Sequence, residues 1–398
     1  MNITIFPKKL RGAVDIIPSK SQAHRYLICA AFADAPTQII CPDVNRDIEA
    51  TVACLNALGA AIERTDNGYN VLPLKTRPNK AVLPCGESGS TLRFMLPIAG
   101  ALGVTADFLL EGRLPQRPLS PLWEEMERMG CKLEWISKDV LRCTGALKEG
   151  MYCIDGSVSS QFITGLLFAL SLIPGKSALN ITGNIESKPY IDMTLEALTD
   201  FGVSIDNNEL FGQFPFKTPG TKKIEGDWSN GAFFLVANAI GNQIDVAELN
   251  QHSKQGDRAV LDILRKLASF TEIDAKDIPD LVPILSIAAA ASKGAKFYNI
   301  RRLRLKESDR VQSVMDMLSA FGITSEAEEN TLTVYPGSFK GCTVDSANDH
   351  RIAMAAGIAA TIASDPVTII NAQCVAKSYP AFWDVYRNLG GTYEQHLR

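Results

Sequence analysis

Apolar and polar residues follow a pattern along this chain that recurs six times. In each copy, apolar residues three or four apart predict an amphipathic helix, and a short apolar run that predicts a strand follows at once. The helix ends in a large apolar residue and then, in five copies, glycine, which is the residue expected where a helix closes in a left-handed conformation. The residues at these junctions are Gly59, Gly130, Gly202, Ala268, Gly322 and Gly390.

The spacing of these junctions predicts the domain organisation. A repeat of about 70 residues has room for two helices and several strands, given mean lengths of about 11 and 5 residues. Six repeats in 398 residues therefore predict two domains of three repeats each. The interval from Ala268 to Gly322 is the shortest, so we expect one repeat to lack a piece, between Phe270 and Asp277. We expect the chain to cross between domains near Ile16–Ser19 and near Gly226.

Composition narrows the class of protein. Apolar residues make up 46% of the chain and the net charge is -4, an ordinary globular balance that disfavours binding to nucleic acid or anionic membranes. Nine cysteines without CxxC spacing, and only four histidines, indicate neither a disulfide framework nor a zinc site. The first residues lack a signal peptide's apolar core, and the apolar stretches at 162–173 and 281–291 are too short to cross a bilayer. We expect a cytoplasmic protein with no metal and no cofactor.

Nine segments carry small hydroxyl residues, cations or a carboxylate, and most of them precede an apolar helix. The amino end of a helix attracts anions through its free N–H groups and its dipole. Taken singly, each segment has a simpler explanation: serines and Asp280 could be N-caps, and the basic run 301–310 could be a solvated surface. Taken together, they predict one cationic cleft between two domains. The segments are PSKSQAHR (18–25), GESGSTLR (86–93), RP (117–118), GSVSSQF (156–162), SKPYID (187–192), IPD (278–280), KESDR (306–310), DHRIAM (349–354) and KSYP (377–380).

These nine segments, in this order, resemble the EPSP synthase family, the 3-phosphoshikimate 1-carboxyvinyltransferases. The resemblance runs from Pro18 to Pro380. It implies an α/β (α+β) fold of two domains, each with three βαβαββ units around a pseudo-threefold axis. Domain I would comprise 1–18 and 226–398, domain II would comprise 19–225, and the active site would lie in the inter-domain cleft.

The resemblance also implies a reaction. The enolpyruvyl group of phosphoenolpyruvate would pass to the 5-hydroxyl of shikimate 3-phosphate by addition and elimination, in aromatic amino acid biosynthesis. Carbon–oxygen bonds break, so protein cations suffice to stabilise the charge. The partners would be these two anionic substrates, with no nucleic acid and no membrane, and the protein would be a monomer. We expect an open empty form that becomes more compact when shikimate 3-phosphate is added, which small-angle scattering would detect.

The resemblance assigns roles residue by residue. Asp280, Glu307 and Lys20 would be catalytic, with Asp280 taking the hydroxyl proton and Lys20 or Glu307 serving C3. Shikimate 3-phosphate would contact Lys20, Ser21, Arg25, Ser159, Ser160, Ser187, Asp280 and Lys306. Phosphoenolpyruvate would contact Lys20, Gly89, Arg117, Gln161, Arg310, Arg351 and Lys377.

Three positions depart from the family pattern. Glu87 stands where asparagine is common in the glycine loop, and could turn away or order a cation such as Arg93. Arg302 stands where an asparagine ligand is common, and Ser90 replaces a threonine. The roles of Glu87 and Arg302 therefore stay open.

Three alternative functions each have a sequence feature that bears on them. The related UDP-N-acetylglucosamine enolpyruvyl transferases normally carry a cysteine in the loop that here reads RLPQRPL (113–119). An RNA-end-binding protein could use the basic run 301–310, but the acidic composition and the lack of interleaved aromatic residues disfavour it. A catalytically silent scaffold is disfavoured by the presence of Lys20, Asp280, Glu307 and Lys377.

Overall fold

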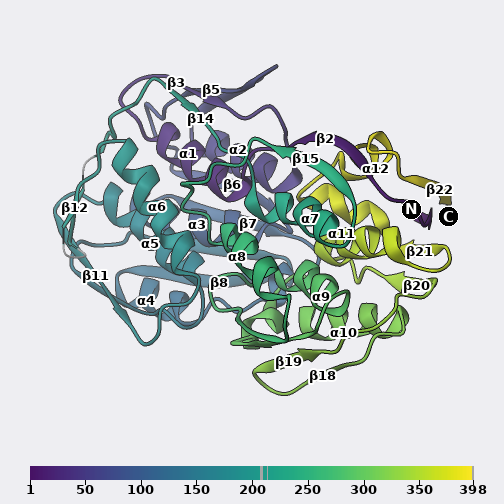
Figure 1. Cartoon of the computed structure of the whole chain (residues 1–398). Coiled ribbons are helices and arrows are strands. Elements are labelled where there is room, and N and C mark those ends of the chain that lie inside the picture. The colour runs from purple at the N-terminus through teal and green to yellow at the C-terminus, as the bar shows by residue number, and fades with distance from the viewer. Residues whose placement is uncertain (207–208, 213, 397–398) are drawn as a thin grey trace. The chain divides into compact units, whose positions relative to one another are not determined.

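The computed structural model describes residues 1–206, 209–212 and 214–396. They fall into two compact units (Figure 1). Unit 1 comprises Met1–Ile17 and Glu225–Arg398, and unit 2 comprises Pro18–Ile224. Both units mix helices with strands, and each is described below by itself.

Unit 2 is built from three sheets and the helices that connect their strands. Its elements in chain order are α1 (Lys20–Ala31), β3 (Thr37–Ile40), α2 (Arg46–Ala57), β4 (Ala61–Thr65), β5 (Gly68–Leu72), β6 (Lys80–Gly86), α3 (Gly89–Leu102), β7 (Thr105–Leu110), η1 (Leu114–Gln116), α4 (Leu122–Arg128), β8 (Cys131–Ser137), β9 (Val140–Gly145), β10 (Met151–Asp155), α5 (Ser160–Leu172), β11 (Lys176–Thr182), α6 (Lys188–Asp200), β12 (Ile205–Asp206), β13 (Glu209–Phe211) and β14 (Thr221–Lys223).

The three sheets of unit 2 share one strand arrangement. Their orders are β14-β3-β5-β4, β6-β7-β9-β8 and β10-β11-β13-β12. In each, the first two strands are parallel and the last two form an antiparallel hairpin at the edge. Alternation decides which face is buried: in β6, Leu83 is buried whereas its neighbour Val82 is exposed. Helices α3 and α5 are apolar on nearly all sides because they lie within the core of this unit.

Unit 1 contains two sheets of the same kind and one that is smaller. Its elements in chain order are β1 (Asn2–Phe6), β2 (Arg11–Asp15), α7 (Trp228–Ala239), β15 (Gln243–Ala247), η2 (Gly256–Ala259), α8 (Val260–Lys266), β16 (Thr271–Asp274), α9 (Val282–Ala290), β17 (Ala295–Tyr298), η3 (Arg301–Leu305), α10 (Arg310–Ala320), β18 (Ser325–Ala327), β19 (Thr331–Val334), β20 (Cys342–Asp345), α11 (His350–Ala359), η4 (Ala360–Ile362), β21 (Val367–Ile370), η5 (Ala372–Lys377), α12 (Phe382–Asn388) and β22 (Thr392–His396).

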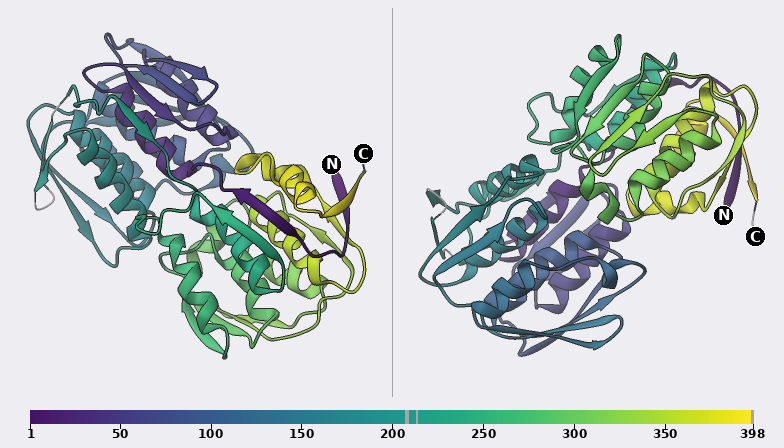
Figure 2. Two further views of the ribbon diagram at one scale, coloured as in Figure 1. Left: turned by 45° about the horizontal axis from the view of Figure 1, so that its top comes forward. Right: turned by 90° about the horizontal axis from the view of Figure 1, so that it is seen from below.

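The sheets of unit 1 have the orders β16-β17-β19-β18, β20-β21-β1-β22 and β15-β2. In the second sheet, β1 takes the place that the last hairpin strand takes elsewhere, and it pairs with both β21 and β22. Figure 2 shows the purple first strand beside the yellow last one. The C-terminal repeat is thus completed by residues from the start of the chain.

The shortened repeat lies elsewhere than the sequence suggests. We expected the loss between Phe270 and Asp277, but that range holds β16, which pairs in parallel with β17 and opens the next sheet. What the chain lacks is an edge hairpin on β15, since α8 leads to β16 through the short connection 267–270. The error arose because the strand after Ala268 resembles the edge strands that follow the other five junctions, although it pairs differently.

Glycine and hydroxyl residues define the helix ends as predicted. The junction residues Gly59, Gly130, Gly202, Gly322 and Gly390 all have positive φ, from 75° to 114°. An added Cβ at Gly59 would lie 2.7 Å from the Thr76 carbonyl oxygen. At the amino ends, side chains accept hydrogen bonds from free N–H groups of the first turn. These caps include Ser19, Ser88, Ser159, Asp309 and Asp349.

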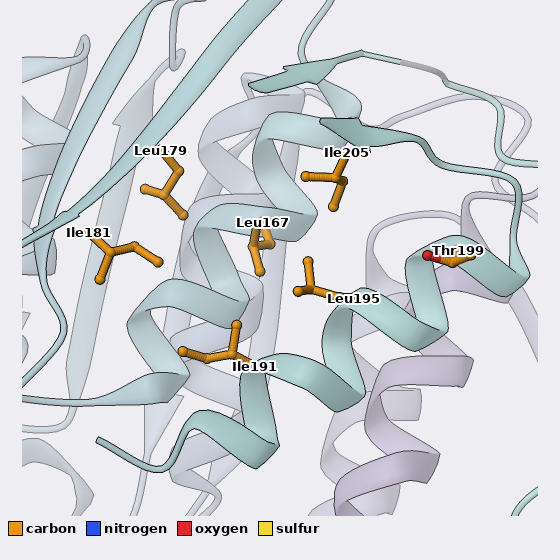
Figure 3. A pocket seen from close by; sticks show the side chains of 7 residues that line it. All are labelled: Leu167, Leu179, Ile181, Ile191, Leu195, Thr199 and Ile205. Carbon is orange, nitrogen blue, oxygen red and sulfur yellow. The ribbon is translucent and has the colours of Figure 1, made fainter. Parts of the chain in front are cut away.

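The two long apolar stretches noted in the sequence are the buried helices α5 and α9. Within the described residues, no helix has the length and apolar character needed to span a membrane. Unit 2 also contains an apolar pocket of about 270 Å³ between α5, α6 and the strands β11 and β12 (Figure 3). Leucine and isoleucine side chains line it, with Thr199 the polar exception. Because the described residues that line it include no cation, this pocket does not match the anion chemistry that the sequence predicts.

Candidate active site

The predicted site residues form two clusters, one in each unit. Unit 2 contains Lys20, Ser21, Arg25, Gly89, Arg117, Gln161, Ser159, Ser160 and Ser187. Unit 1 contains Asp280, Lys306, Glu307, Arg310, Arg351 and Lys377. We call these groups the unit 2 cluster and the unit 1 cluster.

Lys20 is the first residue of α1, where Ser19 caps the helix. Its ammonium Nζ lies 3.0 Å from Oδ2 of Asp47, in the first turn of α2, and the Lys20 side chain is 15% exposed. The sequence analysis missed Asp47, because a single acid at a helix start is a common cap or dipole partner. The ion pair holds the Lys20 side chain at the amino ends of two helices.

Arg25 is buried within unit 2. Its guanidinium donates to Thr194 Oγ1 at 2.9 Å, to the Ser21 carbonyl oxygen at 2.6 Å and to the Tyr190 carbonyl oxygen at 2.8 Å. Burial lowers its pKa to about 10. These contacts hold α1 against α6, so Arg25 has a clear structural role, and its contact with shikimate 3-phosphate stays a prediction.

The glycine loop places two guanidinium groups beside the start of α3. A Cβ at Gly89 would lie 2.6 Å from Nη1 of Arg117 and 2.8 Å from Nη1 of Arg93. Glycine is therefore favoured here by the close approach of these side chains rather than by backbone conformation. The Nε–H of Arg117 is buried and has no hydrogen-bond partner within the described part of the chain. The Glu87 carboxylate lies close to Gly112, where an added Cβ would be 2.8 Å from Glu87 Cδ.

Hydrogen bonds to both the oxygen and the nitrogen of its side-chain amide position Gln161. Its Oε1 accepts a hydrogen bond from Arg93 Nη1 at 2.8 Å, and its Nε2 donates to Ser90 Oγ at 2.9 Å. Arg93 thus orients Gln161, a role that the motif alone did not reveal. The nearby serines differ in what they do: Ser159 caps α5 by accepting from the Gln161 N–H, whereas Ser160 is buried.

Ser187 adopts an unusual conformation before α6. Its φ of 55° and ψ of 42° lie in the left-handed region, and its side chain does not cap the helix. A non-glycine residue in this region is uncommon, and such strain concentrates at functional positions. The adjacent Lys188 forms an ion pair with Asp192, one turn along the helix.

Arg310 is the centre of the unit 1 cluster. It is fully buried and donates to three carboxylates: Nε to Asp349 at 2.9 Å, Nη1 to Asp280 at 2.8 Å and Nη2 to Glu307 at 2.6 Å. Burial by itself would lower the pKa of Arg310, but Asp349, Glu307 and Asp280 together raise it. The helix begins at Arg310, with Asp309 as its cap.

Asp280 is shared by three cations. Its carboxylate accepts from Arg310 and, at 3.0 Å, from Arg351 Nη2, and Lys306 Nζ lies 3.6 Å away. The residue at the N-cap of α9 is Leu281, so the interpretation of Asp280 as a helix cap is wrong. Arg351 also donates to Ser229 Oγ at 3.1 Å, which links α11 to the first turn of α7.

Two groups beside Asp280 have displaced pKa values: Asp257 is buried, and the Lys306 side chain is 22% exposed. Burial lowers the pKa of Lys306 to about 8, although Asp280 opposes this, and the charges of Arg310 and Arg302 contribute to the lowering. Burial raises the pKa of Asp257 to about 7, and the charge of Asp280 adds to it. Asp257 was missed in the sequence, because it lies in a polar stretch, 250–258, of the kind that is typical of a solvated loop.

Lys377 lies at the end of η5, before α12, the last repeat helix. Its Nζ donates to the Asn348 carbonyl oxygen at 3.1 Å. Asn348 and the preceding Ala347 both have positive φ in the loop before α11. Lys377 therefore reaches the DHRIAM segment, although 26 residues separate Lys377 from Arg351.

The charges of the clusters are more balanced than the motifs indicate. In the unit 1 cluster, Lys306, Arg310 and Arg351 all contact Asp280, and Arg310 also binds Glu307 and Asp349. The basic run 301–310 is neutralised in the same way, since Arg301 pairs with Glu329 and Arg304 with Asp309. This pairing disfavours the RNA-end-binding alternative. No group of three or more metal-ligating side chains is seen in residues 1–206, 209–212 and 214–396.

Comparisons with known proteins bear on what these clusters do. The family model described as EPSP synthase (3-phosphoshikimate 1-carboxyvinyltransferase) matches residues 6–271 and 266–386. The chain belongs to the EPSP synthase family. It is 40% identical over 423 aligned positions to the 3-phosphoshikimate 1-carboxyvinyltransferase of Clostridium kluyveri, covering 99% of this chain and 98% of that one. The enzyme of the same name from Clostridium botulinum is 37% identical over 424 positions, with 98% of both chains covered.

Solved structures show the same fold. EPSP synthase from Acinetobacter baumannii superposes with a TM-score of 0.80 at 24% identity, covering 99% of this chain and all of that chain. The α/β fold expected from the resemblance to EPSP synthase is therefore confirmed. The two matched ranges of the family model overlap at 266–271, where α8 meets β16. The break in the match thus coincides with the hairpin that this chain lacks.

Proposed function

We propose that this chain transfers the enolpyruvyl group of phosphoenolpyruvate to the 5-hydroxyl of shikimate 3-phosphate and releases phosphate. The observation that carries the proposal is the Asp280 carboxylate, held among Lys306, Arg310 and Arg351. A carboxylate fixed among cations combines a base with groups that bind phosphate and carboxylate. The full-length relatives are named for this transfer.

The proposed reaction has two stages. In the first, the hydroxyl oxygen bonds to C2 of phosphoenolpyruvate, Asp280 accepts the hydroxyl proton, and C3 gains a proton. In the second, C3 loses a proton, the C2–C3 double bond re-forms, and the C2–O bond to phosphate breaks. Glu307 and Lys20 are the candidates for C3. Glu307 is fixed by Arg310 and is 29% exposed, and Lys20 is fixed by Asp47, so both combine a defined position with access.

We also propose that both clusters act on one pair of substrates, in a cleft between the domains. Each unit would arrange its three repeats around a pseudo-threefold axis. The common order of the three sheets in unit 2, and of two sheets in unit 1, supports the repeat. Phosphoenolpyruvate would bind to Arg117 and Gly89 in the unit 2 cluster and to Arg351 and Lys377 in the unit 1 cluster. The serines before α5 and α6 would bind the shikimate ring and its phosphate.

The test is phosphate release from phosphoenolpyruvate by the purified protein, with shikimate 3-phosphate or UDP-N-acetylglucosamine as acceptor. We expect release with shikimate 3-phosphate only. Lys20→Met should abolish release without lowering the thermal unfolding midpoint by more than a few degrees. Release with UDP-N-acetylglucosamine alone would overturn the proposal in favour of the related transferase, and release with neither acceptor would reject both.

A further inference from the structure

A second layer of polar contacts lies beneath the Lys20–Asp47 ion pair in unit 2. Lys20 and His24 are four residues apart on α1, and Asp47 and Thr51 are four residues apart on α2. Residues at this spacing share one face of a helix. The two helices therefore meet through two successive pairs: Lys20 with Asp47, and His24 with Thr51 one turn further in.

This inner layer is a continuous chain of short hydrogen bonds. His24 Nδ1 lies 2.7 Å from Thr51 Oγ1, which lies 2.7 Å from Thr91 Oγ1 on α3. Thr91 Oγ1 donates to Ser88 Oγ at 2.8 Å, and Ser88 is the N-cap of α3. All four side chains are buried. The chain thus joins α1, α2 and the glycine loop.

The direction of the chain follows from the number of protons. A threonine hydroxyl has one proton to donate. Thr91 gives its proton either to Ser88 Oγ or to the Asp47 carbonyl oxygen, and in both cases it must accept from Thr51. The Thr51 proton is then used, so Thr51 must accept from His24, and His24 carries its proton on Nδ1. Nε2 of His24 is buried without a partner in the described part of the chain, which also favours leaving it unprotonated.

We propose that His24, Thr51 and Thr91 are positioning residues, which hold Lys20 and the glycine loop in the arrangement that binds phosphoenolpyruvate. Each of the three lies on a helix that also supplies residues of this part of unit 2: Lys20 from α1, Asp47 from α2, and Gly89 with Ser90 from α3. The contact of Thr91 Oγ1 with the Asp47 carbonyl oxygen, at 3.3 Å, ties the inner layer to the outer one. None of the three is proposed to touch substrate.

The kinetic test rests on the proposed function and uses Thr51→Val, which keeps the shape of the side chain but removes its hydroxyl. We expect KM for phosphoenolpyruvate to rise about tenfold, with a smaller change in kcat, because a displaced Lys20 binds the anion less well. Thr51→Ser retains the hydroxyl and should stay within about twofold of the original protein.

Leu55→Ala is the matched control, since Leu55 is buried one turn further along α2. It should lower the thermal unfolding midpoint at least as much as Thr51→Val and leave KM unchanged. An equal rise in KM for Leu55→Ala, or no rise for Thr51→Val, would overturn the proposal.

A second measurement does not depend on activity. Nitrogen-15 NMR can report the protonation of the four histidines, and His24→Gln assigns the His24 signal. We expect His24 to be neutral and protonated on Nδ1 from pH 5 to 8, because its partner Thr51 sets this tautomer. A proton on Nε2 would reverse the chain and overturn the inference. If the protein has no transferase activity but His24 gives the expected signal, the proposed function fails while the hydrogen-bond chain stands.

Discussion

Arg310 and Asp349 form an ion pair that is closed to solvent, with Arg310 Nε 2.9 Å from Asp349 Oδ2 and the two side chains 1% and 0% exposed. Asp349 also caps α11 and accepts a hydrogen bond from Ser308. One carboxylate therefore fixes a guanidinium, a loop and a helix start. Its loss would leave a buried positive charge with two carboxylates in place of three.

Asp349→Ala should destabilise the protein strongly. Removing one partner of a buried pair costs about 3–5 kcal/mol, and the lost cap adds about 1 kcal/mol. We expect a clear fall in the urea midpoint of unfolding. Asp349→Asn retains the cap and removes only the charge, so its midpoint should lie between those of Asp349→Ala and the original protein. Equal midpoints for Asn and Ala would show that the charge, rather than the cap, accounts for the whole effect.

Gly89→Ala should weaken binding of phosphoenolpyruvate through Arg117. The added methyl group would lie 2.6 Å from Arg117 Nη1, so the guanidinium must move. We expect KM for phosphoenolpyruvate to rise about tenfold while KM for shikimate 3-phosphate changes little. Steady-state kinetics of Gly89→Ala, Arg117→Ala and the double variant will show whether Gly89→Ala acts through Arg117. If the effects of the two changes simply add, Gly89 acts independently of Arg117 and this explanation is wrong.

The lowered pKa of Lys306, about 8, predicts a pH limit in the free enzyme. Below pH 8 the ammonium is charged and attracts anions, and above it the neutral amine does not. The value of kcat/KM for shikimate 3-phosphate, which reports the free enzyme, should therefore fall as pH rises through about 8. In Lys306→Arg the guanidinium stays charged, so this fall in kcat/KM near pH 8 should disappear. If the fall persists unchanged in that variant, another group causes it.

Leu195→Trp should stabilise unit 2 by filling the pocket in Figure 3. The residue seven places before the junction glycine is Trp123 in one repeat and Trp383 in another, so tryptophan is compatible with this position of the repeat. Cavity filling commonly contributes about 0.5–2 kcal/mol. Leu198→Trp, at a fully buried position on the same helix, should destabilise by overpacking. Thermal unfolding will compare them, and a lower midpoint for both would contradict the prediction.

The helix boundaries at the site were largely predictable from local chemistry. Serine and aspartate before apolar helices, and glycine after them, act on their own backbone, so Ser19, Ser88 and Gly59 could be placed from their neighbours alone. The family and its fold could be predicted for a different reason, because nine ordered segments form a specific signature.

The partners of the charged groups could not be predicted in this way. Arg25 and Lys20 stand in one motif, yet Arg25 turns inward to the Tyr190 carbonyl oxygen, which is 165 residues away. Asp280 looked like a helix cap because the cations that bind it lie in two later motifs. Counting cations in segments therefore overestimated the charge of the clusters, since carboxylates from distant segments compensate it.

The missing hairpin has a practical consequence. Strand β15 pairs with β2 on one side only, and on its other edge the Asn238 amide bonds both the N–H and the carbonyl oxygen of Ile244. The connection from α8 to β16 is exposed at 268–270, so these residues are a natural place to graft a foreign loop, tag or small domain. A reporter inserted there would lengthen a surface connection whose equivalents in the other repeats already carry a hairpin.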